Sequence, residues 1–267
     1  MRERHVIAGL LVSVLAESVL AHETWMMPST FFAKLGEETR LDMSSGMSFP
    51  RLESPILAER VAQAAYRLGQ DVVDVTGLKT AKRSLVLRQS FTKEGVATIW
   101  MDLKPKEIKL RDEEVAEYLD EIDATQDTRS IWAGQKGRVA WKEMYTKHAK
   151  TFVAVGDATK DASWGVSTGA ALEIVPKANP CAIVVGQDFT VELQTNTEPL
   201  PGLPVGLLIE GAKDRVFRTT NAGGRATFPI GTEGRAMLFA VRLLPAEDGK
   251  SWTSDFCTMT FEIRRKK

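Results

Sequence analysis

The sequence predicts a mainly β protein with two β-sandwich domains, the first carrying a helical insertion and the second Ig-like. Most of the chain consists of short segments in which apolar and polar residues alternate, separated by turn residues, a pattern typical of antiparallel sheets. One acidic segment, residues 111–122, instead has the periodicity of a helix. In the second half, about seven short strands follow at regular spacing, which indicates an Ig-like sandwich.

The first domain is expected at residues 22–165. The turn Lys93-Glu94-Gly95 separates two of its expected strands. The alternating pattern predicts strands at Thr39–Met43, Arg60–Arg67, Asp71–Val75, Ser84–Phe91 and Val96–Asp102.

A helical insertion is expected near residues 111–146. Val115, Tyr118, Leu119 and Ile122 recur at the spacing of one helix face. Acidic residues at 112–114 favour the amino end of this helix. The pattern also predicts a second short helix at 137–145, followed by a strand at 150–155 that returns to the sheet.

Small residues and glycine between residues 165 and 169 mark the expected domain boundary, so the second domain is expected at 169–263. Asn221-Ala222-Gly223-Gly224 is a tight-turn signal, because these residues accept positive φ at little cost. The strands expected here are Leu172–Val175, Phe189–Gln194, Val205–Glu210, Arg215–Thr219, Arg225–Pro229, Met237–Leu244 and Cys257–Ile263.

Residues 1–21 have the features of a secretory signal peptide. Arg2 and Arg4 precede an apolar run too short to span a bilayer, and small residues at Val19 and Ala21 suit a signal peptidase. Cleavage after Ala21 would make His22 the first residue of an exported, periplasmic protein. No later stretch is apolar enough to span a membrane directly.

Charge and cysteine content add further limits. The chain has 35 basic and 35 acidic residues, so no electrostatic signal for nucleic acid is present. Cys181 and Cys257 could form a disulfide between the first and last strands of the second domain in an oxidising compartment. Alternatively, they are two buried thiols that pack as small apolar side chains.

The chain shows no motif of an enzyme active site. It lacks a glycine-rich phosphate loop, a Gly-x-Ser-x-Gly elbow, a His-Glu-x-x-His helix and a Cys-x-x-Cys pair. We therefore expect a protein that is not an enzyme.

His22 is the most informative residue, because cleavage would place a free α-amine and an imidazole on the same residue. Such a pair can chelate Ni(II), Co(II) or copper. The expected further metal ligands are His148, the only other histidine after residue 22, and the thioether of Met47. The alternatives are a surface histidine at position 148 and methionines that pack in the core.

Several segments resemble a family of exported bacterial proteins of unknown function, often labelled periplasmic nickel or cobalt uptake transporter components. The first is residues 21–28, Ala-His-Glu-Thr-Trp-Met-Met-Pro. The second is the acidic helix followed by residues 143–150, Glu-Met-Tyr-Thr-Lys-His-Ala-Lys. The third is the turn at 220–226 with the terminal segment 252–261, which is similar to the family's Ig-like second domain.

The resemblance implies a periplasmic protein with two β-rich domains and, in transport-linked members, a metal site at the mature amino terminus. Only His22 carries over, because His148 occupies a position that is usually aromatic and Arg242 stands where many relatives have histidine. The expected function is metal binding linked to nickel, cobalt or copper uptake, with a membrane metal permease as partner. The alternative is a non-catalytic Ig-like module that binds a protein or glycan at the cell envelope.

Overall fold

The computed structural model describes residues 22–266, so the predicted signal peptide lies outside the described residues. Its central feature is a ten-stranded sheet. In spatial order this sheet contains β16 (Val216–Thr219), β15 (Pro204–Ile209), β18 (Gly234–Pro245), β19 (Trp252–Ile263), β11 (Trp141–Val155), β9 (Gly95–Leu103), β5 (Val61–Leu68) and β6 (Asp71–Asp74). The short strands β10 (Lys106–Leu110) and β2 (Phe32–Ala33) pair with β11.

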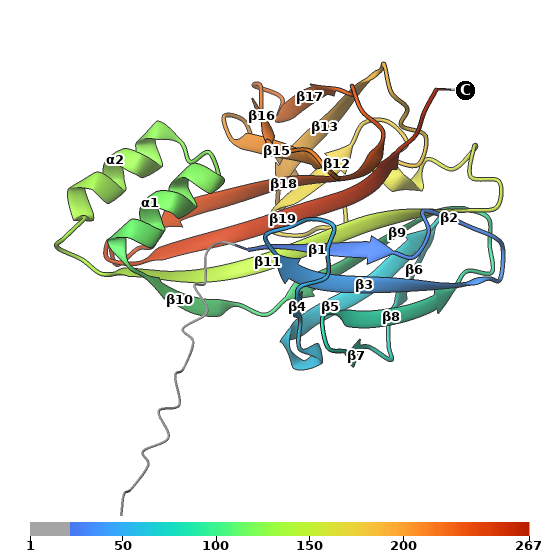
Figure 1. The fold of residues 1–267 in the computed structure, drawn as a ribbon, viewed down its shortest axis with the longest axis horizontal. Helices are drawn as coiled ribbons and strands as arrows, with labels where there is room; N and C mark the ends of the chain where they lie inside the picture. The colour runs from blue at the N-terminus through green and yellow to red at the C-terminus, as the bar shows by residue number, and fades with distance from the viewer. Residues whose placement is uncertain (1–21, 267) are drawn as a thin grey trace, which may run out of the picture.

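Two smaller sheets complete the fold (Figure 1). The five-stranded sheet contains β1 (Glu23–Pro28), β3 (Glu38–Gly46), β8 (Leu85–Ser90), β7 (Lys79–Thr80) and β4 (Ser54–Pro55). The four-stranded sheet contains β12 (Glu173–Pro176), β13 (Asp188–Thr195), β14 (Glu198–Pro199) and β17 (Arg225–Pro229). Short 3-10 turns lie at Ala58–Arg60 and Ser163–Gly165.

Each small sheet packs on part of the ten-stranded sheet, which gives two sandwiches joined by one continuous sheet. The first core joins Leu41 and Leu87 of the five-stranded sheet to Ile99 of β9. The second core joins Phe189 and Phe228 of the four-stranded sheet to other strands of the long sheet.

β11 contributes to both cores, because its side chains alternate between the two faces of the sheet. Ala149 and Val153 belong to the first core, while Phe152 and Ala154 belong to the second. Burial of alternate residues on two faces therefore fixes the register of this strand.

The second sandwich has Ig-like topology. One layer has β12, β13 and β17 side by side, and the other has the order β16, β15, β18, β19. This division matches that of the successive strands of an Ig-like domain into two sheets. The predicted fold class is confirmed: mainly β, with two sandwiches, a helical insertion and an Ig-like second half. Because one sheet serves both sandwiches, the separate units 22–165 and 169–263 stay a prediction.

The insertion consists of α1 (Asp112–Glu121) and α2 (Gln126–Gln135), at one end of the long strands (Figure 1). The first helix agrees with the prediction. The helix predicted at 137–145 is wrong, because α2 ends earlier and residues 141–145 open β11. Within residues 22–266, no helix is long and apolar enough to cross a bilayer.

Both cysteines are free and buried, so the proposed disulfide is absent. The Cys181 thiol faces the backbone of Ala154, whereas Cys257 pairs in register with His148. These two positions on β11 are six residues apart, roughly 20 Å at about 3.3 Å per residue, and a disulfide needs Cα atoms within about 7 Å. The two thiols instead pack as apolar groups in the second core.

Candidate functional site at the start of the first strand

His22, the first residue after the predicted cleavage point, is partly buried, and the residues that follow it form β1, every one of which is buried. β1 pairs antiparallel with β3, with Glu23 opposite Gly46. At its other edge, the hydroxyl of Thr258 in β19 donates to the Thr24 carbonyl and that of Thr260 to the Met26 carbonyl, each at 2.6 Å. The backbone that follows His22 is therefore held by hydrogen bonds on both sides, to β3 and to β19.

Lys147 of β11 holds His22 itself. Its ammonium group donates to the His22 carbonyl oxygen and lies 3.2 Å from the Thr24 hydroxyl. The same ammonium lies 5.3 Å from the ring centres of Tyr145 and Phe256. Burial lowers the pKa of Lys147 to about 8, although the carboxylates of Glu23 and Glu143 act in the opposite direction.

A carboxylate in the loop after β3 lies at the same end of the sheet as the start of β1. The Glu53 oxygens accept hydrogen bonds from the backbone amides of Met47, at 3.1 Å, and Ser48, at 2.9 Å. Burial raises the pKa of Glu53, but these hydrogen bonds and the charge on His22 outweigh it, so the pKa is lowered. The Glu53 carboxylate packs against Gly46, where an added Cβ would lie 2.5 Å from Oε2, and Gly46 is the register partner of Glu23, the neighbour of His22 in the chain.

Met47 lies at the same end of the five-stranded sheet. It follows Gly46, the register partner of Glu23, and its side chain is 41% exposed. The structure thus gathers His22, Met47 and Glu53 around the start of β1.

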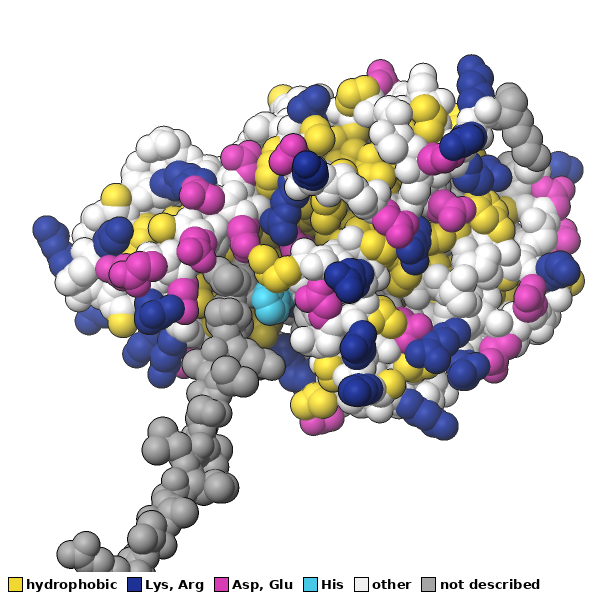
Figure 2. All heavy atoms as spheres, in the orientation of Figure 1, with side chains coloured by type: hydrophobic (Ala, Val, Ile, Leu, Met, Phe, Trp, Pro, Cys, Tyr) yellow, Lys and Arg dark blue, Asp and Glu magenta, His cyan; other side chains and the backbone are white. Residues whose placement is uncertain are grey.

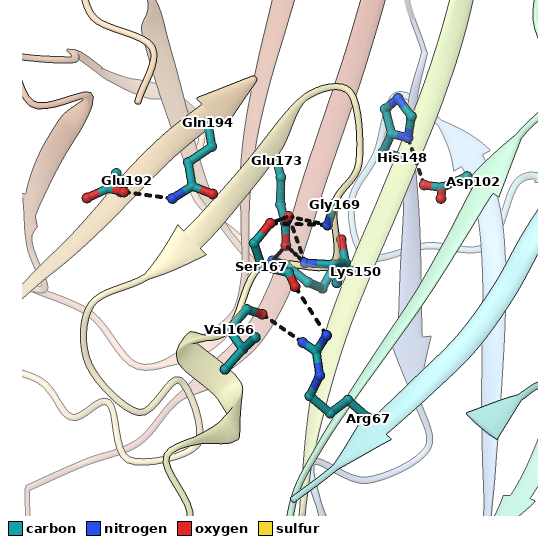
Figure 3. A network of polar contacts seen from close by, with 11 residues as sticks. Arg67, Asp102, His148, Lys150, Val166, Ser167, Gly169, Glu173, Glu192 and Gln194 are labelled. Atoms are coloured by element: carbon teal, nitrogen blue, oxygen red, sulfur yellow. Dashed lines mark hydrogen bonds and ion pairs between the residues drawn. The ribbon is translucent and has the colours of Figure 1, made fainter. Parts of the chain in front are cut away.

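His148 lies on the other face of β11 and does not join this group. Its Nδ1 is 2.7 Å from Asp102 of β9 (Figure 3). Its Nε2 is 3.7 Å from Asp255 of β19. Asp255 also pairs with Arg242 at 2.7 Å. Burial lowers the pKa of His148, but the two aspartates outweigh it and raise the pKa to about 9. His148 is therefore an imidazolium held between carboxylates.

A second buried charge pair lies two residues further along β11. The Lys150 ammonium is 2.5 Å from Glu173 of β12. The same carboxylate accepts from the Ser167 hydroxyl at 2.6 Å and from the amides of Thr168 and Gly169 (Figure 3). Because every oxygen has partners, the pair ties the four-stranded sheet to the long sheet.

The side of β1 that faces the helical insertion carries a third charged group. Glu23 pairs with Arg215 at 2.8 Å, and Arg215 also donates to the backbone carbonyl of Glu121 at the end of α1. Burial raises the pKa of the Glu23 carboxyl, with Arg215 acting against it. This pair fixes the insertion against the start of β1.

Within residues 22–266, no three His, Cys, Asp or Glu side chains are grouped so as to hold a metal ion. A metal at His22 would therefore also need the α-amine, a thioether or donors from outside the chain. Sequence reasoning missed Glu53 and Lys147, which lie far from His22 in the chain. Side chains alternate between the two faces of a strand, so extending the strand predicted at 150–155 back to residue 147 could have placed the Lys147 side chain on the face that carries His22.

The sequence matches, over residues 19–242, the family described as "Domain of unknown function (DUF4198)", and the chain belongs to this family. No curated protein matches. The description of the family assigns neither a metal nor a transport function.

Solved structures with some similarity come from several organisms. The adhesin InvE of Yersinia pseudotuberculosis is 12% identical, with 90% of this chain and 58% of that chain covered and a TM-score of 0.22. Fibronectin(III)-like modules of Clostridium thermocellum CbhA are 8% identical, with coverages of 89% and 94% and a TM-score of 0.21. Murine CEACAM1b is 9% identical, with coverages of 92% and 100% and a TM-score of 0.23. Superpositions of this quality carry no inference about function.

Proposed function

We propose that this chain is a periplasmic metal-binding protein that holds Ni(II), Co(II) or copper at a mature amino terminus beginning with His22, and that it passes the ion to a membrane metal permease. The observation that carries the proposal is that Lys147 holds the His22 carbonyl at the start of β1, where the Glu53 carboxylate packs against Gly46, the register partner of Glu23. Cleavage after Ala21 would add an α-amine at this point.

Preorganisation supports this site. β1 is buried along its whole length, and Lys147 bonds the carbonyl of His22. A terminus that is already ordered loses little conformational entropy when it binds an ion. Metal binding would therefore need no folding step.

The donor chemistry also fits. The amine and imidazole of His22 are nitrogen donors of the kind that Ni(II) and Cu(II) prefer, and Glu53 supplies an oxygen and a negative charge. Met47 adds a thioether, which favours reduced copper. The positive charge of Lys147 is directed at the carbonyl of His22, so it does not occupy these donors.

Titration calorimetry with Ni(II), Co(II) and Cu(II) tests the proposal. The mature protein starting at His22 is compared with a form that carries one additional N-terminal alanine. Since the extension removes the amine from position 22 and leaves the imidazole, we expect affinity to fall at least about tenfold. Affinity should also decline in acid, because protons compete at reference pKa values of about 6.5 and about 7.7 to 8.0.

Glu53→Gln should weaken binding to the mature protein as well. The matched control is Glu59→Gln, which changes another exposed glutamate one short strand away. Equal affinity for the mature and extended forms would contradict the proposed site.

A non-catalytic envelope-binding module is the second candidate. The edge strand β6 exposes Val72 and Val73, at 54% and 41%, between two aspartates. An exposed sheet edge can accept an additional strand from a partner protein. Capture of a peptide by the mature protein, lost in Val72→Asp, with no metal bound at His22, would favour this function.

A further inference from the structure

A groove opens beside the proposed metal site. It has a volume of about 650 Å³ and is lined by Ser48, Arg51, Leu52, Glu53 and Arg83. Glu53 belongs to both places, since its carboxylate lines the groove and also packs against Gly46, which lies opposite Glu23 at the start of β1. A molecule in the groove would therefore lie next to an ion held by His22.

The two loops that form the groove are fixed by a buried hydroxyl. The Ser44 hydroxyl lies 2.9 Å from the carbonyl oxygen of Arg83 and 3.1 Å from that of Ser54, and it accepts from the Glu53 amide at 3.0 Å. Ser44 is completely buried. A hydrogen bond from the Arg51 amide to the Ser48 carbonyl, at 2.8 Å, adds a turn. The groove is thus preorganised rather than formed by free loops.

Arg51 and Arg83 differ from the arginines in the strands of the five-stranded sheet, whose guanidinium groups are paired with carboxylates. Arg40 pairs with Asp42 at 2.7 Å, and Arg88 pairs with Glu38 at 2.5 Å. Across residues 22–266, neither Arg51 nor Arg83 has a side-chain ion pair or hydrogen bond. Two uncommitted guanidinium groups against one carboxylate leave the groove with a net positive charge.

We infer that the groove bounded by Arg51 and Arg83 binds a small polycarboxylate, and that the metal ion reaches His22 as the complex of that polycarboxylate. This inference rests on the proposed function. Guanidinium forks match carboxylates in two-point hydrogen bonds. The volume suits a small organic molecule. Carboxylates that do not contact the arginines would supply the metal donors that the described side chains lack.

Calorimetry on the mature protein tests the inference, with citrate as the polycarboxylate. The titrants are free Ni(II), the Ni(II)–citrate complex, citrate alone and inorganic phosphate. The test variant is Arg51→Gln with Arg83→Gln. The control variant is Arg138→Gln with Arg218→Gln, which removes two exposed positive charges elsewhere.

The expected result is that the test variant binds Ni(II)–citrate roughly ten- to a hundredfold more weakly than wild type, because two charge-assisted hydrogen-bonding groups are lost. Its affinity for free Ni(II) should not fall, because the substitutions remove two positive charges and no proposed metal donor. The control variant should match wild type for every titrant. Far-ultraviolet circular dichroism and a thermal scan check that each variant folds.

Three results would overturn the inference or the function separately. Equal Ni(II)–citrate affinity in wild type and test variant overturns the inference and leaves metal binding at His22 standing. Phosphate binding as tight as citrate, lost in the test variant, overturns the assignment to a polycarboxylate. Binding of citrate through the two arginines with no binding of Ni(II) or its complex overturns the proposed function and the metal part of the inference.

Discussion

Lys147 and His148 are consecutive residues of β11, and their side chains leave opposite faces of the ten-stranded sheet. The Lys147 ammonium contacts the His22 carbonyl and the Thr24 hydroxyl. The His148 imidazole contacts Asp102, at 2.7 Å. The alternation of a strand thus separates the two histidines that the sequence suggested as joint metal ligands.

Replacement of His148 should leave metal binding intact. His148→Gln removes the imidazole from the face opposite His22, so calorimetry with Ni(II) or Cu(II) should give the affinity of the wild-type mature protein. A loss comparable to that caused by extending the amino terminus would mean that His148 is a ligand after all.

The same substitution should reduce stability in a pH-dependent way. Burial lowers the pKa of His148, but Asp102 and Asp255, which face the ring, outweigh it and raise the pKa to about 9 from an ordinary value of 6.5. Arg242 pairs with Asp255 from the neighbouring strand. A raised pKa gives stability that is complete below about pH 6.5 and is lost as pH rises through about 9. The difference in unfolding free energy between wild type and His148→Gln should be about 3 kcal/mol at pH 6 and should shrink towards pH 10. Urea denaturation at several pH values measures it, and a difference independent of pH would contradict the assignment.

Lys150 and Glu173 should be strongly coupled. Lys150→Met leaves a buried carboxylate without its ammonium partner and should cost about 3 to 5 kcal/mol of unfolding free energy. Lys150→Met combined with Glu173→Leu should recover much of this loss, because no charge then stays buried. The exposed pair Arg235 and Glu210 provides the control, and Arg235→Met should cost less than about 1 kcal/mol. Additive effects of the two buried substitutions would contradict the coupling.

The two thiols should be protected in the native protein and free once it unfolds. Burial raises the pKa of Cys181 to about 12 and also raises that of Cys257, so little thiolate is present at neutral pH. Unfolded, non-reduced protein prepared from the periplasm should titrate two thiols per chain. A protein that titrates no free thiol would contradict this prediction and indicate a disulfide between Cys181 and Cys257.

Most strands could be predicted because one face of each is buried and the other is exposed. The alternation fails where burial is complete, and β1 was missed because both of its faces are covered. At the start of β11 the pattern is reversed, since the polar Glu143 is buried while the apolar Met144 is 43% exposed. This reversal is why the sequence predicts a helix there instead of a strand. The helix α2 was missed because Trp132 is its only buried residue.

The candidate site was predictable only in part. His22 could be recognised from the chemistry of a cleaved terminus. Glu53 and Arg83 could not, because their positions depend on the Ser44 hydroxyl, which accepts from the Glu53 amide and donates to the Arg83 carbonyl and so joins two loops distant in sequence. Spacing along the chain carries no information about such contacts.

The pairing of β11 with β19 also constrains the order in which the protein can fold. The two strands are parallel, with Glu143 opposite Trp252 and Thr151 opposite Thr260. The middle of the long sheet therefore cannot form before residues 252–260 are available. Contacts over such long sequence separations form slowly, because a large loop must close before they contribute. Until β19 pairs with it, β11 has one unpaired edge. If the chain crosses a membrane from its amino end, this late pairing would keep it unfolded during the crossing.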